Sequence, residues 1–172
     1  MKLFLILIFG FIVYSTNGQV KVTSTVKVIG KSANQIFAFI QSCDKEKYKN
    51  WHIEHKDFEF IKKTENFVDS EIYFEEIIKG FQVNYTWKVQ QVEQGKFIKL
   101  KAKYFYPIYL ILTFKNESDG VSVQQDLIMG KDSQLIKLDW LIEKFIITRN
   151  VSRNLQIHFV EEFKNLETLI DN

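Results

Sequence analysis

Apolar and polar residues alternate with a period of two through most of the chain between residues 20 and 130. The alternation begins over 20–29, where Val20, Val22, Val26 and Val28 share one face. It predicts a β-strand, because the side chains of a strand point alternately to its two faces. Similar runs follow from residue 57 onward, separated by short turn sequences, and this arrangement predicts an antiparallel meander. The further runs lie at 58–60, 72–78, 83–89, 98–104, 109–113 and 121–127.

The pattern is helical in four places. Ser32 and Gln35 have the spacing of a capping box, which predicts a helix start. A charged stretch over 44–50 is a second, shorter helical candidate. The strongly apolar segment 135–147 is typical of a helix or of a lid over a cavity. The last segment, 150–170, carries apolar residues at helical spacing and predicts a long amphipathic helix.

This order of elements predicts an α+β domain in which an antiparallel sheet wraps around a long C-terminal helix. The same order resembles the helix-grip arrangement of START-like domains, and that resemblance implies an apolar pocket between sheet and helix. The 172 residues of the chain fit one domain of ordinary size with room for a core.

The first 18 residues form a separate unit. Lys2 precedes an apolar run over 3–14, and small and polar residues follow over 15–18. This is the layout of a secretory signal peptide, and the apolar run is short for a membrane span, which needs about 20 residues. We expect cleavage after Gly18, a mature START-like domain over 19–172 and a secreted or periplasmic location. The alternative is an uncleaved segment that anchors the protein to a membrane.

Composition excludes several other functions. The net charge is only +2 and the lysines are spread singly, which argues against a nucleic-acid partner. Cys43 is the only cysteine, so an internal disulfide is impossible, and no nucleophile system around it is recognisable. We therefore expect any chemistry to come from other side chains.

All three histidines lie in two short motifs, and both motifs are candidates for a metal site. His158 and Glu162 are four residues apart, so both lie on one face of the predicted C-terminal helix, toward its apolar side. A carboxylate buried there needs a partner, and a metal ion is one of the few that suffice. The alternative is a hydrogen bond between the two side chains at the edge of the helix.

The strand over 71–78 adds a carboxylate. Glu76 shares its face with apolar residues, whereas Glu75 shares the opposite face with other polar groups, so Glu76 is expected to point inward. The alternative is an edge strand with both carboxylates in water. His52 and His55 lie where the second helical stretch meets the sheet, and either or both can face the pocket.

Together these residues resemble the START-like metal-dependent hydrolases that include 2,4-diacetylphloroglucinol hydrolase and phloretin hydrolase. Those enzymes cleave a carbon–carbon bond between an acyl group and a phenolic ring, with a zinc ion held by two His and two Glu. The resemblance implies His52, Glu76, His158 and Glu162 as metal ligands and His55 as a catalytic residue facing the substrate. It rests on Tyr48-x-x-Trp51-His52-x-x-His55, Tyr73-Phe74-x-Glu76, Arg149-Asn150 and His158-x-x-x-Glu162-x-x-x-Leu166.

The expected function is therefore a metal-dependent hydrolase acting on a small aromatic or acyl compound, with Zn²⁺ suited to the ligands and Fe, Mn and Co not excluded. One alternative is a non-enzymatic carrier of the same fold that binds an apolar molecule or lipid. In another, the metal serves ligand binding or sensing. The expected partner is in each case a small hydrophobic or aromatic molecule.

Overall fold

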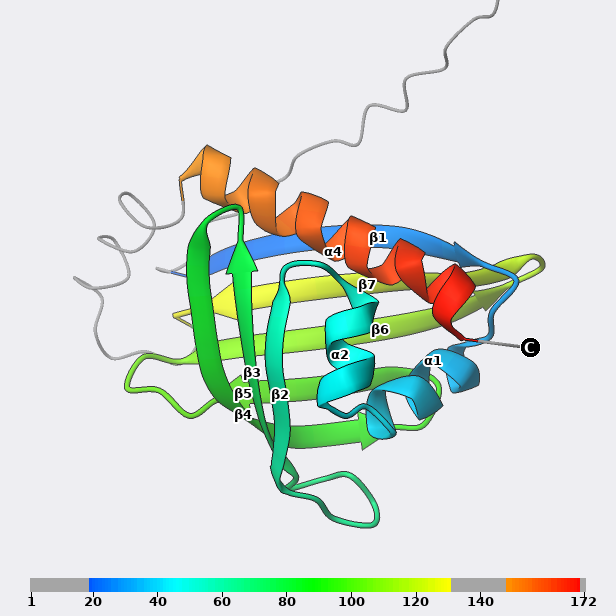
Figure 1. The fold of residues 1–172 in the computed structure, drawn as a ribbon, viewed down its shortest axis with the longest axis horizontal. Coiled ribbons are helices and arrows are strands. Elements are labelled where there is room, and N and C mark those ends of the chain that lie inside the picture. Colours follow the sequence, from blue (N-terminus) through cyan, green and yellow to red (C-terminus); the bar gives the residue numbers. More distant parts are fainter. Residues whose placement is uncertain (1–18, 131–147, 171–172) are drawn as a thin grey trace, which may run out of the picture.

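The computed structural model describes residues 19–130 and 148–170. Within them, seven strands form one antiparallel sheet, in the order β1-β7-β6-β5-β4-β3-β2 (Figure 1). All neighbours except β1 and β7 are also consecutive in the chain, so the sheet is the predicted meander with the first strand added at one edge. The strands are β1 Val20–Ile29, β2 His55–Lys62, β3 Glu71–Ile78, β4 Phe81–Glu93, β5 Phe97–Ala102, β6 Ile108–Glu117 and β7 Gly120–Met129.

Two short helices, α1 (Ala33–Gln41) and α2 (Lys45–Trp51), connect β1 to β2. The predicted capping box starts α1: the Ser32 side chain accepts from the backbone N–H of Gln35, and the Gln35 side chain accepts from that of Ser32. Asp44 caps α2 with a single hydrogen bond, in which its side chain accepts from the backbone N–H of Lys47 at 2.8 Å. Local sequence thus determines where both helices begin.

The long helix α4 (Arg149–Leu169) crosses the sheet, beside β1 for most of its length and near α2 toward its end (Figure 1). Phe159, Phe163 and Leu166 are almost fully buried on the side that packs onto the core. Trp51 connects α2 to α4, because its Nε1–H donates to the backbone oxygen of Glu162 at 2.7 Å and its own backbone oxygen accepts from the side chain of Asn165 at 2.9 Å.

The predicted α+β helix-grip architecture is confirmed, and most element boundaries agree within a few residues. The main difference is β2, which begins at His55 rather than at residue 58. The pairing of His55 with Glu76 is followed by an irregular register before Asp57, and this irregularity interrupts the alternation in the sequence. The predicted signal peptide (1–18) and the apolar segment 135–147 lie outside the described residues. No helix of the described part has the length and apolarity to cross a membrane.

Candidate metal centre

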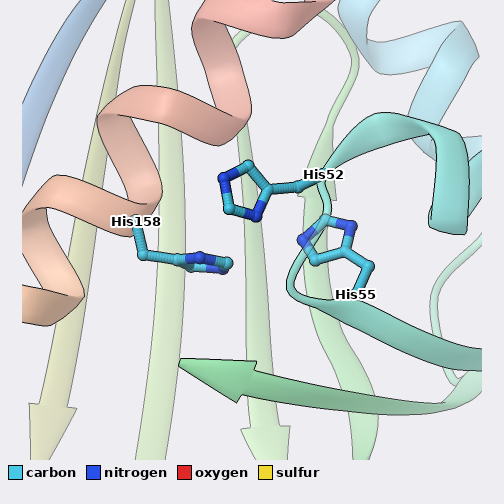
Figure 2. Close-up of side chains that lie close together, drawn as sticks. All are labelled: His52, His55 and His158. Atoms are coloured by element: carbon cyan, nitrogen blue, oxygen red, sulfur yellow. The ribbon is translucent and has the colours of Figure 1, made fainter. Parts of the chain in front are cut away.

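Three elements bring the histidines together (Figure 2). His52 follows α2 as its C-cap, His55 is the first residue of β2, and His158 lies on the buried side of α4. All three are at least 94% buried, and one ring nitrogen of each lies within 4.8 Å of the others. Residues about 100 positions apart in the chain therefore form one cluster of imidazoles.

Two glutamates complete the cluster. The pairing of β2 with β3 sets Glu76 directly opposite His55, and Glu162 lies one turn beyond His158 on α4. The Glu76 carboxylate reaches both rings: one oxygen is 3.8 Å from Nε2 of His55, and the other is 3.5 Å from Nε2 of His158. A Glu162 oxygen is 3.7 Å from the same His158 nitrogen.

The His55 ring is held from two sides. Its Nδ1–H donates to the backbone oxygen of Tyr48 at 2.8 Å, since a carbonyl can only accept. The Tyr48 ring stacks on the imidazole, and the Tyr48 hydroxyl donates to Glu76. Burial lowers the pKa of His55 to about 4, so near neutral pH the ring is uncharged and Nε2 carries a free lone pair.

His158, unlike His55, is surrounded by carboxyl groups that favour its charged form. Its Nδ1–H donates to a carboxylate oxygen of Glu54 at 2.9 Å. Burial alone would lower the pKa of His158, but the carboxylates of Glu76, Glu162 and Glu54 outweigh burial and raise the pKa to about 9. Without a metal, His158 is therefore an imidazolium near neutral pH, enclosed by acidic groups.

The two glutamates differ in protonation. Burial opposes ionisation of Glu76, yet the neighbouring His158, His55 and Tyr48 hold the pKa of its carboxyl below the usual range. Glu162 lacks this support: burial and the nearby Glu76 raise the pKa of its carboxyl to about 8, although His158 opposes the shift. The site thus combines one ionised carboxylate with one carboxyl group that keeps its proton near pH 7.

Hydrogen bonding leaves part of the cluster without partners. Among the described residues, the buried side-chain atoms that lack a hydrogen-bond partner are Nε2 of His55, Nε2 of His158 and Nε1 of Trp87. Two of the three therefore belong to the histidine cluster. Nε2 of the imidazolium His158 carries a proton and lies 3.5 Å from Glu76, whereas Nε2 of the neutral His55 carries a free lone pair. An unpaired buried polar group costs about 1–3 kcal/mol, so the lone pair of His55 beside a carboxylate indicates a missing partner.

His52 is arranged differently from the other two histidines. Its Nδ1 accepts the backbone N–H of Glu54 at 3.2 Å, so in the neutral ring the proton lies on Nε2. That nitrogen is 3.7 Å from an oxygen of Glu161, whose side chain is 49% exposed. In this orientation neither nitrogen of His52 offers a free lone pair.

An apolar cavity of about 450 Å³ ends at the cluster. Glu76, His158, Glu162 and Tyr48 are among its lining residues, whereas the side chain of His55 is fully buried behind them. The other walls are largely aromatic and aliphatic. They include Phe58, Phe74, Tyr85, Trp87, Leu110 and Phe163.

All five residues expected from the sequence lie in this one cluster: His52, His55, Glu76, His158 and Glu162. Glu75 lies on the other face of β3, where it contacts Tyr73 and Gln82, as the alternation predicts. Trp51 packs in the core. Glu54 and Tyr48 are two further residues of the site that have no role in the expectations above, although Tyr48 stands in the motif that carries the resemblance. The position of Glu54 between two histidines is the one sequence signal that singles it out.

Comparison with known proteins identifies the fold. No family model and no curated protein matches the sequence. Solved structures do match, including a START superfamily protein from Mycobacterium smegmatis (17% identity, TM-score 0.52, covering 83% of this chain and 97% of that one). Ginseng major latex-like protein 151 from Panax ginseng has 11% identity and a TM-score of 0.51, with 81% and 97% of the two chains covered. TTHA0849 from Thermus thermophilus has 12% identity and a TM-score of 0.63, with 87% and 96% covered.

These structures match nearly their whole length to this chain, which therefore has the START-like, helix-grip fold. At identities below 20% the likeness concerns the fold alone. One fold can carry unrelated functions, so the function has to be argued from the site itself.

Proposed function

We propose that this protein is a metal-dependent hydrolase that binds a small aromatic or acyl compound in its apolar cavity. The observation that carries the proposal is the pair formed by His55 and Glu76. A buried nitrogen lone pair faces an oxygen of an ionised carboxylate 3.8 Å away, with no proton between the two atoms. Two electron-rich atoms in this position are stabilised by a cation between them.

The distances in the cluster support a metal of the size of Zn²⁺. Ligand atoms that each lie about 2.0–2.1 Å from a tetrahedral zinc are about 3.3–3.4 Å from one another. The Glu76–His55, Glu76–His158 and Glu162–His158 contacts are 3.5 to 3.8 Å long, slightly longer than this spacing.

We propose His55, Glu76, His158 and Glu162 as the metal ligands. The resemblance implies His52 in place of His55, but the ring contacts favour His55. Nε2 of His55 is free, whereas Nδ1 of His52 accepts from the backbone of Glu54 and leaves the ring proton on Nε2. His55 is also hidden from the cavity, so we assign it no contact with substrate. His52 remains a neighbour whose removal should affect metal binding less.

A divalent metal held here supplies Lewis acidity and a bound water of lowered pKa. The chain itself supplies orientation and a dry environment. Aromatic walls such as Phe74 and Trp87 enclose a flat apolar molecule and exclude water, while Glu162 and His158 meet its polar end. This arrangement suits an acyl group attached to a phenolic ring, with the acyl carbon directed at the cluster.

Metal analysis of the purified protein tests the proposal. Wild type should hold about one equivalent of metal, and a His158→Ala/Glu162→Ala double variant should hold almost none. The matched control is Glu161→Ala, which changes a largely exposed carboxylate on the same helix and should keep its metal. A wild type with no more metal than the double variant would overturn the proposed metal centre.

Activity is tested separately, with acylphloroglucinols and phenolic ketones as substrates. The metal-loaded protein should hydrolyse at least one of them, and removal of the metal with a chelator should abolish turnover. Metal binding without any turnover would favour the sensing or ligand-binding role.

The strongly apolar cavity favours a second candidate, a carrier of a small hydrophobic molecule. A carrier should bind an apolar fluorescent probe with the same affinity before and after treatment of wild type with a metal chelator. Dependence of probe binding on the metal would speak against a pure carrier.

A further inference from the structure

Glu54 contacts two of the three histidines of the cluster, although it is not one of the proposed ligands. It lies between α2 and β2, and its side chain is 15% exposed. We infer that Glu54 is the positioning residue of the metal centre: it orients His158 as a ligand and keeps His52 from acting as one. The inference rests on the proposed function and adds to it the reason for the choice of ligands.

Both carboxylate oxygens of Glu54 are engaged. Oε2 accepts Nδ1–H of His158 at 2.9 Å, and Oε1 accepts the backbone N–H of Lys79 at 2.9 Å. The ammonium group of Lys79 lies 3.8 Å from the same Oε1. A carboxylate can only accept hydrogen bonds, so Glu54 acts as an acceptor at both oxygens.

The β3–β4 turn gives this carboxylate a rigid anchor. Lys79 and Gly80 have φ angles of 48° and 88°, as in the tight two-residue turns that join antiparallel strands. The backbone oxygen of Glu54 also accepts the N–H of Ile77 at 2.9 Å. Glu54 is therefore fixed to the same hairpin that carries Glu76, and it connects that hairpin to α4.

The contact with Glu54 decides which ring nitrogen of His158 can bind a metal. An acceptor at Nδ1 keeps a proton there, so any lone pair of the neutral ring is on Nε2. That nitrogen lies 3.5 Å from Glu76 and 3.7 Å from Glu162. Carboxylates that accept the second N–H of a metal-binding histidine act in this way in many metalloproteins.

The backbone of Glu54 has the opposite effect on His52. Its N–H donates to Nδ1 of His52 at 3.2 Å, which occupies that lone pair and leaves the ring proton on Nε2. One residue thus frees the metal-facing nitrogen of His158 and blocks the nearest histidine. This explains how a cluster of three imidazoles selects two of them.

The test is Glu54→Gln, which preserves shape and changes only the hydrogen bonding. Two donors face this side chain, but an amide has a single oxygen to accept from them. An amide NH₂ turned toward His158 would move the ring proton to Nε2, the wrong nitrogen for metal binding. We expect the Zn²⁺ affinity, measured by competition with a chromophoric chelator, to fall about 10- to 100-fold.

The matched control is Glu161→Gln, which removes the same charge near the same lysine. A Glu161 oxygen lies 3.7 Å from the ammonium group of Lys79, and the two side chains are 49% and 41% exposed. Its Zn²⁺ affinity should remain within about threefold of wild type. Equal affinities of wild type and Glu54→Gln would overturn the inference and leave the proposed metal centre intact.

NMR of the ¹⁵N-labelled histidine rings tests the contact without any metal. In metal-free wild type the Nδ1 proton of His158 should be protected from exchange by Glu54, and Glu54→Gln should lose this protection. Loss of the signal in Glu161→Gln as well would show a general loosening and overturn the inference. If wild type binds no Zn²⁺, the proposed metal centre fails, and protection of this proton then decides whether Glu54 still orients His158.

Discussion

The rings of Tyr48 and His55 stack in parallel, with centroids 3.9 Å apart and planes within 9° of each other. Tyr48 also accepts Nδ1–H of His55 through its backbone oxygen and donates its hydroxyl to Glu76. One aromatic residue of α2 therefore orients two of the proposed ligands, one from β2 and one from β3.

Tyr48→Phe keeps the stacking and removes only the hydroxyl. We expect the free energy of unfolding to fall by about 1–3 kcal/mol, because the buried Glu76 carboxylate loses a donor. Urea denaturation of the metal-free protein measures the change. Tyr73→Phe is the matched control, since Tyr73 donates to the outward-facing Glu75 over 3.3 Å, and it should leave stability unchanged. Equal effects of the two changes would contradict a special role for Tyr48.

Metal binding should release protons near pH 7. His158, with a pKa of about 9, and Glu162, with a pKa of about 8, must each lose a proton before they can act as ligands. Affinity should therefore increase as the pH rises toward 9, and about two protons should leave per metal ion at pH 7. Calorimetry in buffers of different ionisation enthalpy counts these protons, and a count near zero would contradict the proposed ligands.

The protonated Glu162 carboxyl should also affect stability without metal. Its folded-state pKa of about 8 exceeds the unfolded value near 4.5, so the folded protein binds the extra proton between these limits. Stability should consequently fall as pH rises from about 5 to 8. Glu162→Gln removes this dependence, so wild type should lose stability relative to the variant over that range in urea titrations. A constant difference between the two proteins would show that Glu162 ionises normally.

A large side chain placed in the cavity should weaken ligand binding without changing the metal content. Leu110 lines the cavity, and its neighbour Ile111 on the same strand points to the opposite face of the sheet. Leu110→Trp should weaken binding of an apolar fluorescent probe at least tenfold and leave the metal content unchanged. Ile111→Trp should leave both unchanged. Equal probe binding by the two variants would place the probe outside this cavity.

The sequence predicted the sheet and the inward direction of Glu76 well, because alternation with a period of two depends on neighbouring residues alone. It also identified the shared face of His158 and Glu162 from their spacing. The roles of Glu54 and Tyr48 were not predictable in this way. They depend on the pairing of His55 with Glu76 and on a contact between residues 104 positions apart, neither of which leaves a periodic signal.

The orientation of the His52 and His55 rings also could not be predicted from the sequence. His52 and His55 are three residues apart, and their spacing allows either to face the interior. The difference arises from two local hydrogen bonds, one to the backbone N–H of Glu54 and one to the backbone oxygen of Tyr48. These bonds depend on where α2 ends and β2 begins, and the irregular register after His55 obscures that boundary in the sequence.

The two hydrogen bonds between Trp51 and α4 have a consequence for the order of events during synthesis. The imidazoles of His52 and His55 leave the ribosome about 100 residues before His158, and the proposed metal centre has no complete set of donors until α4 docks. Metal binding at the proposed centre therefore requires α4 to be packed against α2. A nascent or C-terminally truncated chain should expose its first two histidines to solvent and compete poorly for the ion.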